Sequence, residues 1–217
     1  MEAVDLKIIG IAGVAQVGKD TFTDSLIDLF KEQGQSAQRV AFADALKEDL
    51  KDFLLAKTGV NPYTKDSSSK NLLRPLMVEY GRLMRALTHG QYWIDEIKEK
   101  IENNTKNNII SILSDVRYAN EAEWVNQSTS GITIHLHRSG IEAANKEEAH
   151  HDPLAQKTCH YSINWRNCEN ASQLHHQVEK YFHAFEISSR FIRSAISPPN
   201  QKTSQRRLVS ARIGRKT

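Results

Sequence analysis

The chain has 217 residues, 39% of them hydrophobic and 25% charged, which is long enough for one domain with a buried core. A mean hydropathy of −0.54, the lack of an apolar run near 18 residues and an acidic N-terminus argue against a membrane span and a secretory signal peptide. The two cysteines, Cys159 and Cys168, cannot form a disulfide framework, so the sequence predicts a protein of the reducing cytoplasm without membrane association.

Strand-like apolar runs alternate with segments of helical periodicity over the first 186 residues. Strands are predicted at 6–12, 38–43, 109–113, 131–137 and 158–163. Helices are predicted at 20–33, 45–57, 72–87, 92–101, 119–127 and 170–186, and Asp44 is expected to cap the second of them. The segments expected to be loop-like are 58–70, 103–108 and 138–156. This alternation indicates an α/β protein of three layers, in which a mostly parallel sheet of about five strands is flanked by helices.

The turn after the first predicted strand carries the segment Gly13-Val14-Ala15-Gln16-Val17-Gly18-Lys19, which matches the pattern G-x-x-x-x-G-K. A buried strand before it and a helix after it form the context in which such loops wrap backbone N–H groups around phosphates. Lys19 would reach the β- and γ-phosphates of a nucleoside triphosphate. The guanine-specifying pattern N-K-x-D is missing, so ATP is favoured. The residue after the lysine is usually a Ser or Thr that binds Mg²⁺, whereas here Asp20 stands there and Thr21 follows.

Charged residues further along the chain point to a second anion. Asp115 and Arg117 follow the strand predicted at 109–113, and ligands gather at the carboxyl ends of parallel strands. We therefore expect Asp115 near the phosphates and Mg²⁺, and Arg117 near a second anion. Three arginines can share one face of the helix predicted at 72–87, and arginine suits bidentate phosphate binding: Arg74, Arg82 and Arg85. The alternative interpretation of Asp115 and Arg117 is a surface ion pair, and that of the three arginines is a solvated basic face.

Several segments, taken together, resemble the phage-type deoxynucleoside monophosphate kinases over about residues 6–182. They are, in order, Gly18-Lys19-Asp20-Thr21, in which Asp replaces the usual Ser or Thr, then Phe42–Lys47, Arg74–Gly81, Tyr92-Trp93, Asp115-Val116-Arg117 with Asn120-Glu121, Arg138-Ser139-Gly140, and a final strand ending at Asn164. The resemblance implies a P-loop kinase fold. It also implies Mg²⁺-dependent transfer of the γ-phosphoryl group of ATP to a deoxynucleoside 5′-monophosphate, giving the diphosphate for DNA precursor synthesis.

The resemblance further implies roles for individual residues. ATP phosphates would be bound by Gly13, Gln16, Val17, Gly18, Lys19, Asp20 and Thr21. The catalytic residues would be Lys19, Asp115, Arg117 and Arg138, and the Mg²⁺ ligands Asp20, Thr21 and Asp115. The acceptor would contact Asp44, Lys47, Arg74, Arg82, Arg85, Trp93 and Arg117. Residues of about 45–103 would form the acceptor-binding helices. A lid at about 138–156 would be unusual in its four acids, Glu142, Glu147, Glu148 and Asp152, beside a single Lys146.

The C-terminal segment differs in composition from the kinase-like domain expected at 1–186. Residues 187–217 hold eight Lys and Arg and no Asp or Glu, whereas acids outnumber bases in the rest of the chain. The composition predicts a disordered tail able to bind polyanions. This leaves open a second enzyme, a P-loop kinase that phosphorylates a hydroxymethylated pyrimidine within DNA, with the tail binding the polymer. Three further alternatives remain open. The tail is solubilising and has no partner, the protein is a non-enzymatic P-loop switch, or the chain forms a homodimer.

Overall fold

The computed structural model of the chain describes residues 7–128, 131–166, 168, 170 and 172–183. The tail expected at 187–217 and the last residues of the helix expected at 170–186 lie outside the described residues. Five strands form one sheet in the order β2-β3-β1-β4-β5, and every neighbouring pair is parallel. The strands are β1 (Ile8–Ala12), β2 (Ser36–Val40), β3 (Ile109–Val116), β4 (Gly131–His137) and β5 (Tyr161–Asn164). The predicted parallel sheet of about five strands is confirmed.

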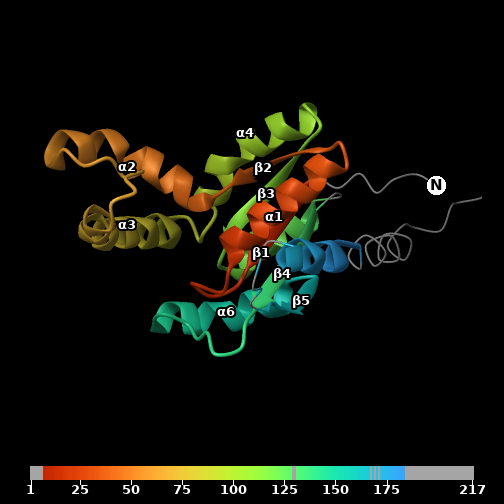
Figure 1. Cartoon of the computed structure of the whole chain (residues 1–217). Helices are drawn as coiled ribbons and strands as arrows, with labels where there is room; N and C mark the ends of the chain where they lie inside the picture. Colours follow the sequence, from red (N-terminus) through yellow and green to blue (C-terminus); the bar gives the residue numbers. More distant parts are fainter. Residues whose placement is uncertain (1–6, 129–130, 167, 169, 171, 184–217) are drawn as a thin grey trace, which may run out of the picture.

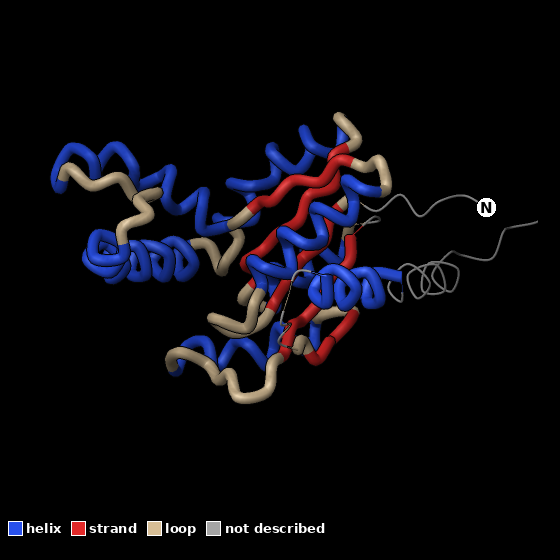
Figure 2. Tube along the Cα trace, in the orientation of Figure 1, coloured by secondary structure: helices blue, strands red, loops and turns tan. Residues whose placement is uncertain are grey.

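Helices cover both faces of this sheet, which gives the three predicted layers (Figures 1 and 2). Side chains alternate along β1, so that Ile9 and Ile11 lie in one apolar cluster and Ile8 and Ala12 in another. The first cluster includes side chains of α1 (Lys19–Glu32) and of the helical residues 172–183. The second includes side chains of α4 (Tyr92–Lys106) and α5 (Ala119–Gln127). Both faces of the central strand are therefore buried, as its continuous apolar sequence requires.

Two helices extend away from the sheet. An opening separates them from the sheet, and a third helix lies on the other side of this opening. The helices α2 (Phe42–Thr58) and α3 (Ser67–Leu87) extend to the left in Figure 1 and share a small apolar cluster of Leu50, Leu54 and Leu73. Helix α6 (Lys146–Thr158) lies below the sheet in the same view. Among the described residues, no helix combines the length and apolar character needed to cross a membrane.

The structure corrects two expected element ends in the middle of the chain. The break expected at 103–108 is wrong for its first four residues, because α4 continues to Lys106. Asn104 is buried there and donates from Nδ2 to Oγ of Ser111 at 3.0 Å, so a polar residue serves as a core residue. The strand expected to end at residue 113 runs on to Val116 and includes Ser114 and Asp115.

Three further expectations fail at helix starts. The strand expected at 38–43 ends at Val40, since α2 already begins at Phe42. The loop expected at 58–70 overlaps α3, whose N-cap Asp66 accepts a hydrogen bond from the backbone N–H of Ser69 at 2.8 Å. The segment expected to be irregular at 138–156 contains most of α6, which begins after the N-cap Asn145. For α3 and α6 a local polar cap starts a helix inside a polar sequence, whereas the N-cap of α2, Ala41, has no side-chain cap of its own.

Candidate active site

The loop between β1 and α1 has the backbone of an anion-binding turn. Positive φ angles occur at Gly13 (130°), Gln16 (63°) and Gly18 (105°). A Cβ on Gly13 would lie 2.5 Å from the carbonyl oxygen of Leu136, and a Cβ on Gly18 would lie 2.7 Å from Nε1 of Trp165. Glycine is thus required at both positions by conformation and by space. The loop is fixed against β4 and the chain after β5 at the carboxyl ends of the strands, where ligands of such sheets bind.

Lys19 is the first residue of α1 and folds back over this loop. Its ammonium donates to the carbonyl oxygens of Gly13 at 2.6 Å and Val14 at 2.8 Å. Burial lowers the pKa of Lys19, and the nearby charge of Arg117 lowers it further, while Glu148 and other carboxylates act in the opposite direction. The predicted phosphate-binding lysine is therefore partly buried and adjacent to the loop, where it can reach an anion held by the loop backbone.

The two residues expected to bind Mg²⁺ after the lysine are exposed at the start of α1. Asp20 forms an ion pair with Arg39 at 2.8 Å, and Nε of Arg39 donates to Oγ of Ser114 at 2.8 Å. Thr21 is exposed beside it. The described part of the chain contains no group of three or more His, Cys, Asp or Glu side chains that could hold a metal ion. A metal here would rely on oxygen ligands from the bound phosphates as well as on the protein, as Mg²⁺ commonly does.

Asp115 caps helix α2 from the end of β3. Its two carboxylate oxygens accept hydrogen bonds from the backbone N–H groups of Phe42 and Ala43, each at 2.9 Å. This corrects the expected capping role of Asp44, which lies inside the first turn and instead accepts a hydrogen bond from Lys47 at 2.9 Å. Burial raises the pKa of Asp115, while the two N–H groups and the charge of Arg117 lower it. A Mg²⁺ ligand role for Asp115 stays a prediction.

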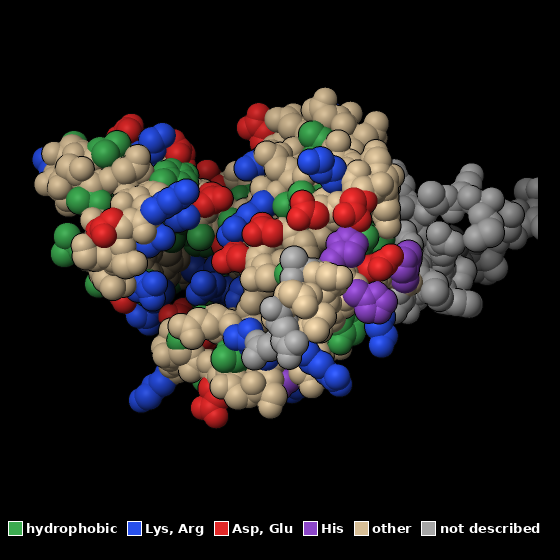
Figure 3. Space-filling view, viewed as in Figure 1, with side chains coloured by type: hydrophobic (Ala, Val, Ile, Leu, Met, Phe, Trp, Pro, Cys, Tyr) green, Lys and Arg blue, Asp and Glu red, His purple; other side chains and the backbone are tan. Residues whose placement is uncertain are grey.

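A cavity of about 520 Å³ opens between the loop, the α2–α3 pair and α6. Ala15 of the loop and Asp115 lie on its wall. It brings together most of the predicted acceptor residues, namely Lys47, Arg74, Arg82, Arg85, Trp93 and Arg117. Figure 3 shows basic side chains gathered around the hollow between the α2–α3 pair and the sheet. Asp44 and Arg138 are not on its wall; Arg138 donates to the carbonyl oxygen of Gln16, at the phosphate loop, at 2.9 Å.

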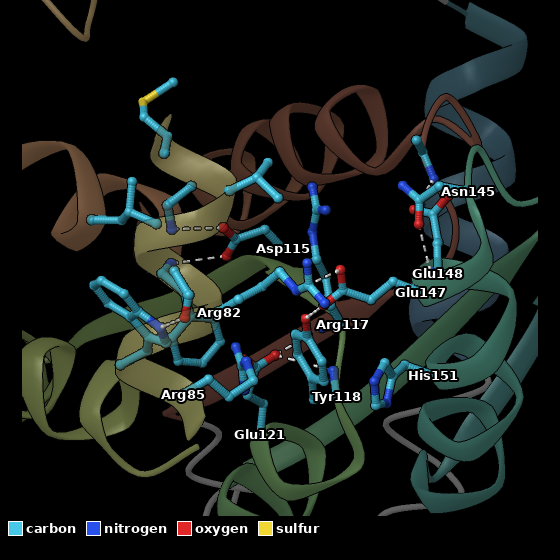
Figure 4. A pocket seen from close by; sticks show the side chains of 18 of the residues that line it. Arg82, Arg85, Asp115, Arg117, Tyr118, Glu121, Asn145, Glu147, Glu148 and His151 are labelled. Carbon is cyan, nitrogen blue, oxygen red and sulfur yellow. Dashed lines mark hydrogen bonds and ion pairs between the residues drawn. The ribbon is translucent and has the colours of Figure 1, made fainter. Parts of the chain in front are cut away.

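Arg85 belongs to a buried ion pair at the floor of this cavity (Figure 4). Its Nη2 donates to Glu121 at 2.7 Å, and its guanidinium stacks 3.4 Å from the ring centre of Tyr118. The other oxygen of Glu121 accepts from the backbone N–H groups of Arg117 and Tyr118 at 2.8 and 3.2 Å. Burial raises the pKa of Glu121, and Arg85 lowers it. Glu121 thereby fixes the backbone at Arg117, and Nη1 of Arg85 is buried with no hydrogen-bond partner among the described residues.

Trp93 is a core residue that reaches the cavity with only part of its surface. It is 2% exposed, donates from Nε1 to the carbonyl oxygen of Gly81 at 3.3 Å, and packs edge-on against Tyr80 and Tyr92. Its neighbours in the fold explain its burial without a ligand. The expected contact of Trp93 with the acceptor therefore stays a prediction.

Two acids of the segment expected to form a lid, which the sequence did not single out for a role, reach the candidate site from α6. Glu148 accepts a hydrogen bond from the backbone N–H of Ala15 in the phosphate loop at 2.7 Å, and its other oxygen accepts from the N–H of Ala144 at 2.7 Å. Glu147 accepts from the hydroxyl of Tyr118 at 2.6 Å and lies 3.8 Å from Nε of Arg82 (Figure 4). A sequence signal did exist, because Asn145 followed three residues later by Glu148 is a helix-start pattern that places this acid in the first turn.

The contact with α6 also perturbs Tyr118. Burial and the hydrogen bond to Glu147 raise the pKa of Tyr118 to about 12, so its hydroxyl stays a donor at neutral pH. The ring lies between the guanidinium of Arg85 and the ring of His151, whose centroid is 4.6 Å away. Tyr118 consequently connects the floor of the cavity with α6, a link that the sequence did not predict.

Comparisons with known proteins find similar folds but no relative in sequence. No protein-family model matches the chain, and no curated protein matches it. Solved structures similar to it include dephospho-CoA kinase from Campylobacter jejuni, with 13% identity, a TM-score of 0.44, and coverage of 84% of this chain and 98% of that one. Shikimate kinase from Bacteroides thetaiotaomicron has 12% identity, a TM-score of 0.44, and coverage of 83% and 98%. A gluconokinase from Sinorhizobium meliloti 1021 has 14% identity, a TM-score of 0.43, and coverage of 88% and 99%. Likeness at this level identifies no substrate.

Proposed function

We propose that the protein transfers the γ-phosphoryl group of ATP to a deoxynucleoside 5′-monophosphate. The observation that carries this proposal is that the phosphate loop opens directly onto a cavity lined by five basic side chains, with Arg74, Arg82 and Arg117 exposed among them. A donor site and an acceptor site for two phosphorylated molecules would then share one opening. Its volume of about 520 Å³ lies within the ordinary range for small-molecule sites.

The donor side fits ATP because the loop already binds an anion. The N–H of Ala15 holds a carboxylate of this chain, which shows that the loop backbone accepts negative charge. Lys19 lies beside it, and Asp20 and Thr21 are the exposed oxygen donors that would hold Mg²⁺ together with the phosphates. Bound Mg²⁺ would supply charge neutralisation on the phosphate oxygens.

The acceptor side fits a phosphate joined to an apolar group. Arg82 and Arg117 offer planar guanidinium donors that match phosphate oxygens, while Phe42, Leu46 and Met77 supply an apolar wall. An oxygen of the acceptor phosphate would attack the γ-phosphorus, and the bond from that phosphorus to the β–γ bridging oxygen would break, releasing ADP. The attacking oxygen is already anionic, so the step needs alignment and positive charge rather than a strong base.

The deciding experiment measures ADP formation by the full chain with ATP, Mg²⁺ and each deoxynucleoside 5′-monophosphate in turn. Arg117→Lys keeps the charge but removes the bidentate donor, so we expect it to raise the KM for the monophosphate or lower kcat while ATP affinity stays unchanged. Lys51→Arg, an exposed substitution on α2 outside the cavity, is the control. Equal loss of ATP binding in Arg117→Lys would refute this placement of the acceptor, and inactivity of the wild type with every monophosphate would refute the proposed substrate.

A second candidate substrate is DNA, favoured by the eight basic residues and no acids of residues 187–217. The test is truncation after Glu186, assayed on free deoxynucleotides and on oligonucleotides with hydroxymethylated pyrimidines side by side. A DNA kinase should lose tenfold or more of its activity on DNA, with a loss that shrinks as salt rises. A free-nucleotide kinase should keep its kcat and KM within about twofold, since the core side chains described lie before residue 184.

A further inference from the structure

The first turn of α6 places two consecutive carboxylates on the two sides of the candidate site. Glu148 accepts the hydrogen bond from the backbone N–H of Ala15 in the phosphate loop at 2.7 Å. Glu147 accepts from the hydroxyl of Tyr118 at 2.6 Å and lies 3.8 Å from Nε of Arg82, on the side proposed for the acceptor (Figure 4). We call Glu147 and Glu148 the acid pair. Each of the two acids therefore contacts a different half of the site.

Capping of α6 accounts for only some of the contacts of Glu148. Acids at a helix start are ordinary, because they satisfy free backbone N–H groups and the helix dipole. One oxygen of Glu148 does so by accepting from the N–H of Ala144 at 2.7 Å, while Asn145 caps the helix by accepting from the N–H of Glu148 at 2.9 Å. The other oxygen of Glu148 leaves the helix for the phosphate loop. Its charge also acts to raise the pKa of Lys19, the lysine expected to bind phosphate.

The donors that hold the acid pair are donors that a phosphate would use. They are a loop N–H, a tyrosine hydroxyl and a guanidinium, and all three bind phosphate oxygens as readily as carboxylate oxygens. A phosphate at the loop would therefore displace Glu148, and a phosphate between Tyr118 and Arg82 would displace Glu147. Rotation of the Glu148 side chain alone would also break its bond to Ala144, whereas movement of the whole helical turn preserves that bond.

The two acids belong to one turn, so its movement removes both from the site. We propose that the acid pair is an internal competitor for both phosphates, and that ATP, by displacing this turn of α6 from the loop, also frees the acceptor side. The proposal rests on the proposed function, which supplies two phosphorylated substrates. Such coupling is reciprocal, so the acceptor would raise the affinity for ATP by the same factor by which ATP raises the affinity for the acceptor.

The construction of α6 suits a movement of its first turn alone. Its second half is fixed, because Asp152 pairs with Nε2 of the buried His135 at 3.0 Å and Ala155 is 1% exposed. Pro153 lies inside the helix and has no N–H, so the carbonyl oxygen of Ala149 receives no helical hydrogen bond from it. The helix is thus weakened directly after the acid pair. Bending there would move the first turn while the remainder stays packed.

The first test measures dissociation constants on the full chain by calorimetry. The ligands are AMP-PNP with Mg²⁺ and each of dAMP, dCMP, dGMP and dTMP, alone and together. We expect AMP-PNP to lower the dissociation constant of the bound monophosphate by about fivefold or more. Glu147→Gln should tighten AMP-PNP binding, and Glu148→Gln should tighten monophosphate binding, each by about threefold or more, because either change favours the released turn. Variants that affect only the site they contact would overturn the coupling.

Two further variants separate release of the turn from a general effect of charge. Glu142→Gln removes the same charge from an exposed position before α6 and should change neither dissociation constant. Pro153→Ala changes no charge and restores a helical N–H opposite the carbonyl of Ala149, so it should favour the straight helix and weaken both ligands about twofold or more. Circular dichroism shows that each variant is folded. Unchanged or tighter binding in a folded Pro153→Ala variant would overturn the hinge.

Hydrogen exchange followed by mass spectrometry separates this inference from the choice of substrate. AMP-PNP should speed exchange at the amides of Ala144 and Glu148 about tenfold, while the amide of Ala155 keeps its rate. If AMP-PNP binds but no monophosphate does, the proposed substrate is wrong and this measurement alone decides the inference. Unchanged or slower exchange at the first two amides would overturn it. If neither the wild type nor Glu148→Gln binds AMP-PNP, the proposed function and this inference are both wrong.

Discussion

Replacing Glu148 with alanine should tighten ATP binding, because this carboxylate occupies a backbone donor that a phosphate needs. The 2.7 Å bond from the N–H of Ala15 to the carboxylate is short, and hydrogen bonds to charged groups typically contribute about 1.5–3 kcal/mol. Glu148 is half-buried, so water weakens the bond and the lower end of this range, about 1.5 kcal/mol, applies. That free energy corresponds to about a tenfold change in the dissociation constant of ATP.

Isothermal titration calorimetry of the full chain with ATP, with and without Mg²⁺, measures this effect. Glu148→Gln keeps a neutral acceptor and should give a smaller gain than Glu148→Ala. Glu142→Ala is the control, because it removes the same charge from an exposed position of the same lid segment and should leave ATP affinity unchanged. If Glu148→Ala binds ATP no more tightly than the wild type, the carboxylate does not compete with phosphate. If the wild type itself fails to bind ATP, the proposed function is wrong instead.

Two more predictions concern buried charges near the cavity. Glu121→Ala should lower the free energy of unfolding by about 3 kcal/mol, because it leaves Arg85 buried without its partner, and the melting temperature should fall by about 6–12 °C. The control is Glu48→Ala, which breaks an exposed ion pair and should leave the melting temperature unchanged. A fall no larger than that of the control would contradict this role of Glu121. Lys19→Met should lower kcat at least 100-fold without unfolding the protein. Burial and Arg117 lower the pKa of Lys19 in the folded state, so the charge of Lys19 opposes folding at neutral pH. The melting temperature of the wild type, relative to that of Lys19→Met, should therefore rise with pH as Lys19 deprotonates. A difference between the two melting temperatures that does not change with pH would show that the pKa is not lowered.

The sequence was informative wherever a pattern is local. The phosphate loop was predictable because its glycines, its lysine and the elements on either side lie within about 25 consecutive residues, and the strand before it and helix after it appear as β1 and α1. The strand alternation likewise reflects burial on both faces of one sheet. These features depend on neighbours along the chain, so a reader of the sequence sees them directly.

Contacts between distant segments were not predictable. Asp44 has the residue type and position of a helix cap, yet Asp115 caps α2 from a strand more than 70 residues away. The sequence predicts Glu148 only as one acid of the expected lid, because its contact with Ala15 depends on how α6 lies over the loop. In each case a polar group is satisfied by a partner that only the fold brings near.

The close approach of Gly18 to Trp165 makes this tryptophan an optical reporter of the phosphate loop. Trp165 is 3% exposed, lies edge-on to Phe22 of α1 at 5.2 Å, and leaves no room for a Cβ on Gly18. Movement of the loop around a triphosphate would change the surroundings of its indole and therefore its fluorescence. Trp93 lies on the wall of the cavity and would respond to the proposed acceptor. Since Trp124 is the third tryptophan of the chain, Trp124→Phe combined with either Trp93→Phe or Trp165→Phe leaves one emitter, whose fluorescence can follow the filling of one site at a time.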